Sequence, residues 1–134
     1  MTDTIDYRID PALDDTALND LFSRAWPDHA PRAYGTVLAR SLGVVAAFVG
    51  DRLIGFVNLA TDGGEHAFLL DPTVDTAYRR RGIGRELVRQ AGALARNRGC
   101  TWLHVDYEPA LAPFYHATGF EDSLAGVMRL DRTT

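Results

Sequence analysis

The segment Thr76–Arg85, with the sequence TAYRRRGIGR, restricts the fold of this chain more than any other segment. Residues 66–74 before it form an apolar run typical of a strand, and the apolar residues after Ile83 follow the 3.6-residue period of a helix. A strand end, a tight turn containing Gly82 and Gly84, and a helix start therefore succeed one another. Such a turn presents unpaired backbone amides at the positive end of the helix dipole, which favours binding of a phosphate group.

Hydrophobic periodicity and turn residues predict the elements around this segment. They are a strand at 5–9, helices at 15–26 and 31–40, strands at 44–49, 53–59 and 66–74, a helix at 83–98, a strand at 101–106, a helix at 109–118 and a strand at 126–130. A helix of about 16 residues separates the strands at 66–74 and 101–106, so these two strands are expected to run parallel. The fold class is α/β (α+β): a single domain of residues 1–134, with a mixed β-sheet flanked by helices in the order β-α-α-β-β-β-α-β-α-β.

Composition excludes several classes of protein. The chain has 134 residues, 46% of them apolar and 24% charged, and no apolar run approaches the roughly 18 residues that a membrane span needs. The start, Met-Thr-Asp-Thr, lacks the basic and apolar stretches of an export signal, so we expect a cytoplasmic protein without a membrane partner. The lone Cys100 excludes an internal disulfide and a thiolate zinc cluster, and we expect no metal.

The positive charge of the chain is concentrated in one stretch. All 14 cations are arginine, and seven of them lie between residues 79 and 98 beside a single acid, Glu86. The net charge of the whole chain is nevertheless −4. A positive block in an acidic protein favours a local anionic ligand, whereas nucleic-acid binding favours a basic domain. We therefore expect no nucleic-acid partner.

The glycine turn differs from two widespread phosphate-binding loops. A Walker loop requires a lysine before Ser or Thr, and the chain contains no lysine. The Rossmann fingerprint requires a third small residue at the position of Leu87. A different class of phosphate-binding loop is therefore indicated.

Two motifs carry a family resemblance. Arg79–Gly84 fits the pattern (Q/R)xxGx(G/A), and Phe114–Phe120, FYHATGF, fits FYxxxGF. The chain resembles the GCN5-related N-acetyltransferase (GNAT) family. This resemblance implies acetyl-coenzyme A (acetyl-CoA) as acetyl donor, with its pantetheine arm between the strand ending at Val74 and the strand at 102–106, and its diphosphate on the glycine turn. The implied cofactor-binding residues are Val74, Arg79, Arg80, Arg81, Gly82, Ile83, Gly84 and Arg85.

The resemblance also implies the catalytic groups. The main-chain amide at Val74 is expected to bind the thioester oxygen, and Tyr115 is expected to protonate the departing thiolate. The general base that removes the proton of the amine is Glu65, His66, Asp71 or water. Of these, we include Asp71 with Tyr115 and Val74 among the expected catalytic residues. Some family members carry a glutamate six residues before the Val74 position.

In this chain that position holds Phe68, so the glutamate mechanism does not transfer directly. We expect an N-acetyltransferase in which a primary amine of a small molecule or peptide attacks the thioester directly. A non-catalytic acyl-CoA-binding or sensing module of the same fold is the alternative. The resemblance is also compatible with a homodimer, although no sequence feature identifies an interface or the acceptor.

Overall fold

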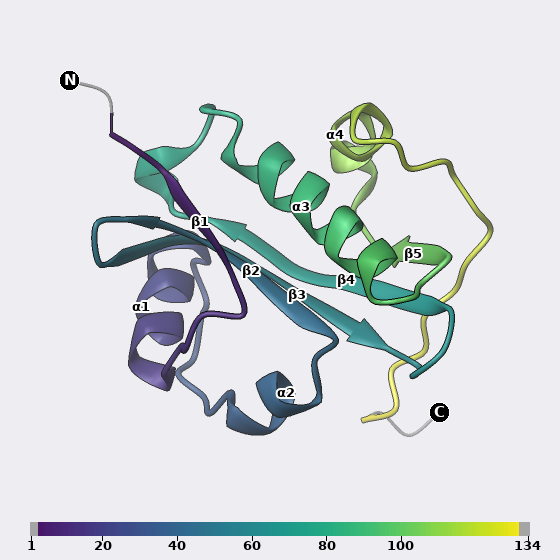
Figure 1. Ribbon diagram of the computed structural model, residues 1–134, viewed down its shortest axis with the longest axis horizontal. Coiled ribbons are helices and arrows are strands. Elements are labelled where there is room, and N and C mark those ends of the chain that lie inside the picture. Colours follow the sequence, from purple (N-terminus) through teal and green to yellow (C-terminus); the bar gives the residue numbers. More distant parts are fainter. Residues whose placement is uncertain (1–2, 132–134) are drawn as a thin grey trace.

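Five strands form a mixed sheet in the order β1-β2-β3-β4-β5 (Figure 1). The computed structural model describes residues 3–131. The strands are β1 (Asp6–Ile9), β2 (Gly43–Val49), β3 (Arg52–Thr61), β4 (His66–Val74) and β5 (Trp102–Val105). The helices are α1 (Asp15–Ala25), α2 (Gly35–Arg40), α3 (Ile83–Asn97) and α4 (Ala112–Ala117), with 3₁₀ turns at Thr76–Tyr78 and Pro109–Leu111. The pairs β1–β2, β2–β3 and β3–β4 are antiparallel, and the pair β4–β5 is parallel. The predicted mixed sheet flanked by helices is confirmed.

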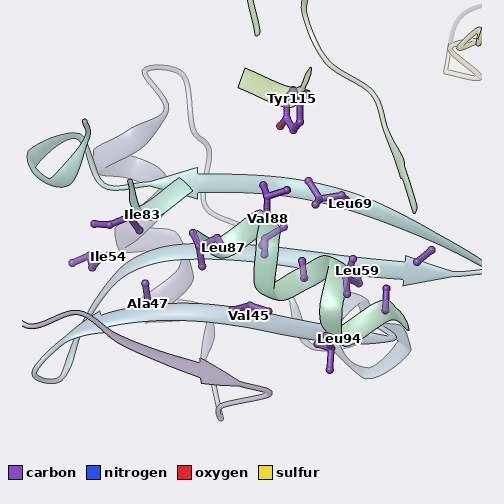
Figure 2. Packing of buried hydrophobic residues seen from close by; sticks show 14 residues of the cluster. Val45, Ala47, Ile54, Leu59, Leu69, Ile83, Leu87, Val88, Leu94 and Tyr115 are labelled. Carbon is purple, nitrogen blue, oxygen red and sulfur yellow. The ribbon is translucent and has the colours of Figure 1, made fainter. Parts of the chain in front are cut away.

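Two apolar layers hold the helices on the sheet. The apolar stripe of α3 packs on one face, where Figure 2 shows Leu87 and Leu94 beside Val45 of β2 and Leu59 of β3. On the opposite face, α1 buries Leu18, Leu21 and Phe22 against side chains of β2 and β3. Each methylene group removed from water stabilises the fold by about 0.8 kcal/mol. These two apolar layers are therefore the main source of stability. Among residues 3–131, no helix combines the length and apolar content needed to cross a bilayer.

A β-bulge interrupts β4 just before its end. Asn58 of β3 pairs with Leu70, but Phe56 pairs with Thr73, so Asp71 and Pro72 together oppose a single residue of β3. Asp71 accommodates the extra residue with φ +53°, in the left-handed region that Asp tolerates better than most residues. The bulge redirects the last residues of β4.

The same strand separates from β5 near this bulge. The parallel pairing covers only His66–Leu69 of β4 and Trp102–Val105 of β5. β4 continues to Val74 with no β5 partner, so its β5-facing edge is open over residues 70–74. The family resemblance implied that the pantetheine arm lies at this place, between the two strands.

The expected strand at 126–130 is absent, and this prediction was wrong. The structure describes residues 121–131 as irregular and exposed. The pattern of this segment suits a strand, but a strand exists only when its backbone pairs with a neighbouring edge. In this structure the segment pairs with neither edge strand of the sheet.

The helix expected over 31–40 begins only at Gly35. Side chains of α1 hold the preceding loop in another conformation: Asp15 accepts the Tyr34 amide at 2.8 Å, and Asn19 accepts the Arg32 amide at 3.1 Å. These bonds satisfy the Arg32 and Tyr34 amides and fasten the loop to α1 in a non-helical conformation.

A buried ion pair joins the end of α1 to the segment after β4. The Asp75 side chain is 3% exposed and accepts from Arg24 Nε at 2.7 Å and from the Ala77 amide at 3.0 Å. Arg24 also donates to the Leu53 carbonyl at 2.8 Å. Burial by itself raises the pKa of the Asp75 carboxyl, but these hydrogen bonds and the charge of Arg24 outweigh it and lower the pKa below 3.8.

We predict that Arg24→Met destabilises the fold by about 3 kcal/mol, because it leaves a buried carboxylate without its main partner. Since the folded-state pKa of Asp75 lies below its ordinary 3.8, the stabilisation is present above pH 3.8 and is lost as pH falls below it. Urea unfolding of both proteins at pH 7 and pH 3 measures this. An equal difference in unfolding free energy at the two pH values contradicts the assignment.

Candidate active site

A cleft of about 690 Å³ lies beside the open end of β4. Its walls come from the end of β4, the glycine turn, the first turn of α3, α4 and the end of α1. The lining residues include Trp26, Pro72, Thr73, Val74, Arg79, Arg80, Gly82, Ile83, Gly84, Arg85, Phe114 and Tyr115. Elements that are distant in the sequence therefore meet at one cavity.

The glycine turn has the backbone form of an anion-binding loop. Arg79, which follows the 3₁₀ turn, is extended. Arg80 and Gly82 both have a positive φ, +66° and +79°. Left-handed Gly82 is followed directly by the right-handed helical residue Ile83, and a pair of this kind points successive amides to one side of the chain. No side chain of residues 3–131 caps the start of α3, which begins directly after Gly82. The first-turn amides stay available at the positive end of a 15-residue helix.

Gly84 lines the cleft between β4 and α4. A Cβ atom at this position lies 3.6 Å from Phe114 Cζ and 3.7 Å from Val74 Cγ2. These are ordinary contact distances, so a methyl group fits but a larger side chain enters the space between β4 and α4. At Gly82 the surroundings are open, and its positive φ is the reason for glycine there.

The arginines of the turn do not all face the cleft. Arg80 and Arg85 line it, and neither has an ion-pair partner within the part of the chain that the structure describes. Arg79 also lines it and donates to the Ala25 carbonyl at 3.2 Å. Arg81 instead lies 3.5 Å from the Asp3 carboxylate and over the Tyr78 ring. Of the predicted binding residues, Arg81 alone is outside the lining.

Tyr115 projects from α4 to the cleft. It is 3% exposed, its ring stacks on Tyr107 at 4.8 Å, and Phe114 and Phe120 contact it edge-on. Figure 2 shows it on the α4 side of the apolar layer that contains Val88 and Leu69. Burial raises the pKa of the Tyr115 phenol above 10.0, so the hydroxyl stays protonated at neutral pH.

Asp71 lies at the bulge, immediately before the lining residues Pro72 and Thr73. Desolvation by the protein atoms around the Asp71 carboxyl raises its pKa above 3.8, although the residue as a whole is exposed. The positive charge of Arg32 partly opposes this rise. The Asp71 charge in turn contributes to the raised pKa of Tyr34, whose hydroxyl is buried without a hydrogen-bond partner. Asp71 therefore faces the loop between α1 and α2.

The structure does not bring Glu65 or His66 to the cleft. Both lie at the opposite end of β4: Glu65 accepts from the Thr101 hydroxyl at 3.0 Å, and His66 Nδ1 is 2.8 Å from His104 Nε2. Phe68 stacks on His104 and is likewise outside the lining. Asp71 is not among the lining residues either, but it directly precedes the lining residue Pro72, so it is the acid–base candidate nearest to the cleft along the strand.

Sequence reasoning missed Trp26, which lines the cleft from the end of α1. The nearby ion pair of Arg24 with Asp75, and the bond from the Thr76 hydroxyl to the Arg24 carbonyl at 2.8 Å, hold this helix end beside the glycine turn. These contacts join residues about 50 positions apart, so the pattern of neighbouring residues in the sequence does not predict them.

Comparisons with known proteins agree with this architecture. An acetyltransferase of the GNAT family from Streptococcus pneumoniae TIGR4 superposes with a TM-score of 0.82 at 22% identity, covering 97% of this chain and all of that one. An aminoglycoside N-acetyltransferase in complex with CoA superposes with a TM-score of 0.74 at 20% identity, covering 99% and 98% of the two chains. At these identities the likeness shows the fold.

A probable glucosamine 6-phosphate N-acetyltransferase of rice, Oryza sativa subsp. japonica, is 36% identical over 58 residues. The match covers 43% of this chain and 35% of the rice protein, so it spans about a third of that protein's length. The family model described as "Acetyltransferase (GNAT) family" matches residues 15–120 and so includes both the glycine turn and the FYHATGF segment. The chain belongs to the GNAT acetyltransferase family.

Proposed function

We propose that the protein is an acetyl-CoA-dependent N-acetyltransferase that acts on a primary amine of a small molecule or peptide. One observation carries this proposal: uncapped amides at the start of α3 and the Tyr115 side chain border the same cleft. Membership of the GNAT family and the CoA complex of a protein with the same fold support it. A cytoplasmic location stays a prediction from the sequence.

Acetyl-CoA, when bound, supplies an activated acetyl thioester. The diphosphate is assigned to the amides of Gly82–Arg85, with the lining residues Arg80 and Arg85 adding charge complementarity. The open edge of residues 70–74 offers backbone groups for the amide-rich pantetheine arm. The Val74 amide is assigned to the thioester oxygen, where negative charge develops during attack.

Two side chains are assigned to proton transfer. Tyr115 holds the proton that a departing thiolate requires, because burial keeps its phenol neutral. An alkyl ammonium of pKa about 10.4 must lose a proton before it attacks, and Asp71 is the candidate acceptor beside the cleft. Its raised pKa makes it a stronger base than an ordinary aspartate.

The non-catalytic module stays the alternative because Phe68 occupies the position of a glutamate that some family members use. A sensing module binds acetyl-CoA but releases no free thiol with any amine. Thiol release measured over a panel of amines, including amino sugars and aminoglycosides, separates the two functions and identifies the acceptor class.

We predict that Gly84→Val weakens acetyl-CoA binding about 10- to 100-fold, because its methyl groups crowd the space beside Val74 and Phe114. Gly84→Ala is the matched control, since its single Cβ meets ordinary contact distances, and it is expected to retain binding. Calorimetry with acetyl-CoA measures both affinities. Unchanged affinity in the folded valine variant contradicts the assigned diphosphate and pantetheine path.

We predict that Tyr115→Phe lowers kcat about 100-fold or more and leaves the affinity for acetyl-CoA nearly unchanged. The phenylalanine keeps the ring packing against Tyr107 and removes only the hydroxyl. Steady-state thiol release and calorimetry measure the two quantities. Wild-type kcat in this variant excludes Tyr115 as the acid.

We predict that Asp71→Asn lowers kcat about 100-fold and removes the acidic limb of the pH profile, which in the wild type lies above pH 3.8. Asparagine tolerates the positive φ of this position, so the bulge is retained. The raised folded-state pKa means that the ionised carboxylate costs stability at neutral pH. The variant is therefore expected to unfold at the same or higher urea concentration, and an unchanged pH profile rules Asp71 out as the base.

A further inference from the structure

Two histidines face each other across the parallel strands β4 and β5, which run side by side in Figure 1. His66 Nδ1 lies 2.8 Å from His104 Nε2, and the centroids of the two rings are 5.0 Å apart. His66 is the first residue of β4, whereas the cleft borders the last residues of that strand. The histidine pair is therefore separate from the candidate active site.

The pair lies on the face of the sheet opposite α3. The residues that alternate with these histidines, Leu103 and Val105 of β5 and Ala67 of β4, pack into the layer with α3. Because side chains alternate along a strand, both imidazoles project from the other face. His104 is exposed, and its ring stacks on Phe68 at 4.7 Å. The two rings are thus held together on a surface that solvent reaches.

No other side chain of residues 3–131 hydrogen-bonds to either imidazole. The facing nitrogens share one proton when both rings are neutral, because one nitrogen donates and the other accepts. A change of tautomer moves that proton to the outer nitrogen of the donating ring. Both facing nitrogens then carry a lone pair, and a neutral imidazole with a free lone pair is the commonest metal ligand in proteins.

The spacing of the two nitrogens favours one type of coordination. With metal–nitrogen bonds of about 2.0–2.1 Å, nitrogens 2.8 Å apart subtend an angle of about 86° at the metal. This angle suits square-planar or octahedral coordination, whereas a tetrahedral Zn²⁺ site needs the two nitrogens about 3.3 Å apart. Imidazole ligands at nearly right angles are typical of Cu²⁺ and Ni²⁺.

We propose that His66 Nδ1 and His104 Nε2 chelate one Cu²⁺ or Ni²⁺ ion. Within residues 3–131 no group of three or more His, Cys, Asp and Glu side chains could hold a metal, so water completes the coordination. The bound ion links β4 to β5 and stabilises the folded chain. The sequence expectation of no metal did not consider this pair, whose members are 38 positions apart. The site does not depend on the proposed function.

Calorimetry of the full chain with Cu²⁺ or Ni²⁺ tests the proposal. The wild type is expected to bind one ion at this pair. His66→Gln and His104→Gln are each expected to weaken binding about 10- to 100-fold, because the remaining imidazole no longer has a second nitrogen held beside it. His116→Gln, at a 46% exposed histidine beside Asp122, is the matched control and is expected to keep the wild-type affinity.

Two further measurements identify the ligands without any assay of activity. The electron paramagnetic resonance spectrum of bound Cu²⁺ is expected to show two nitrogen donors in the wild type and in the control, and fewer in the two pair variants. A saturating ion is expected to raise the Tm of the wild type and the control but not that of the pair variants. Thermal unfolding without metal checks that each variant is folded.

Three results overturn the metal site: no binding by the wild type, wild-type affinity in His66→Gln and His104→Gln, or loss of binding in His116→Gln. The choice of metal has its own test. Tighter binding of Zn²⁺ than of both Cu²⁺ and Ni²⁺ contradicts the assigned coordination geometry.

Discussion

The separation of β4 from β5 after Leu69 and Val105 is the feature on which the candidate site depends. β5 is paired over its whole length and ends at Val105, so residues 70–74 of β4 continue without a β5 partner and keep a free backbone on the inner edge. The bulge at Asp71 and Pro72 bends β4 at this point and inserts one residue. The free edge of residues 70–74 follows from the end of β5, and the position of Asp71 follows from the bulge.

A second constraint fixes what surrounds the opening. The carboxylate of Asp75, one residue beyond β4, is neutralised by Arg24 and bonded to the Ala77 amide. A buried charge needs such partners, and here they come from α1 and from the turn that leads to α3. The ion pair therefore sets the distance between the end of α1, the glycine turn and the end of β4, which together form the cleft wall.

Local motifs predicted the parts of the site that lie close together in the sequence. The glycine turn is one continuous segment, so its backbone form and the start of α3 could be expected from Gly82, Gly84 and the helical period after Ile83. Tyr115 was indicated by its own motif, and its place at the cleft agrees with that expectation, although its catalytic role stays a prediction. Trp26 and the outward turn of Arg81 were missed, because each depends on contacts between distant residues.

By itself the sequence determined which residues can form strands and helices, where the amides of α3 are exposed, and which family the chain resembles. These properties depend on periodicity, capping and glycine conformation, all of which act within a few residues. The tertiary structure decided which edges pair. It left 126–130 unpaired, placed Glu65 and His66 at the far end of β4, and placed Asp71 at the bulge, one residue before the lining of the cleft. Strand pairing and the placement of side chains depend on backbone hydrogen bonds and packing between segments far apart in the chain. A local sequence pattern does not identify those partners.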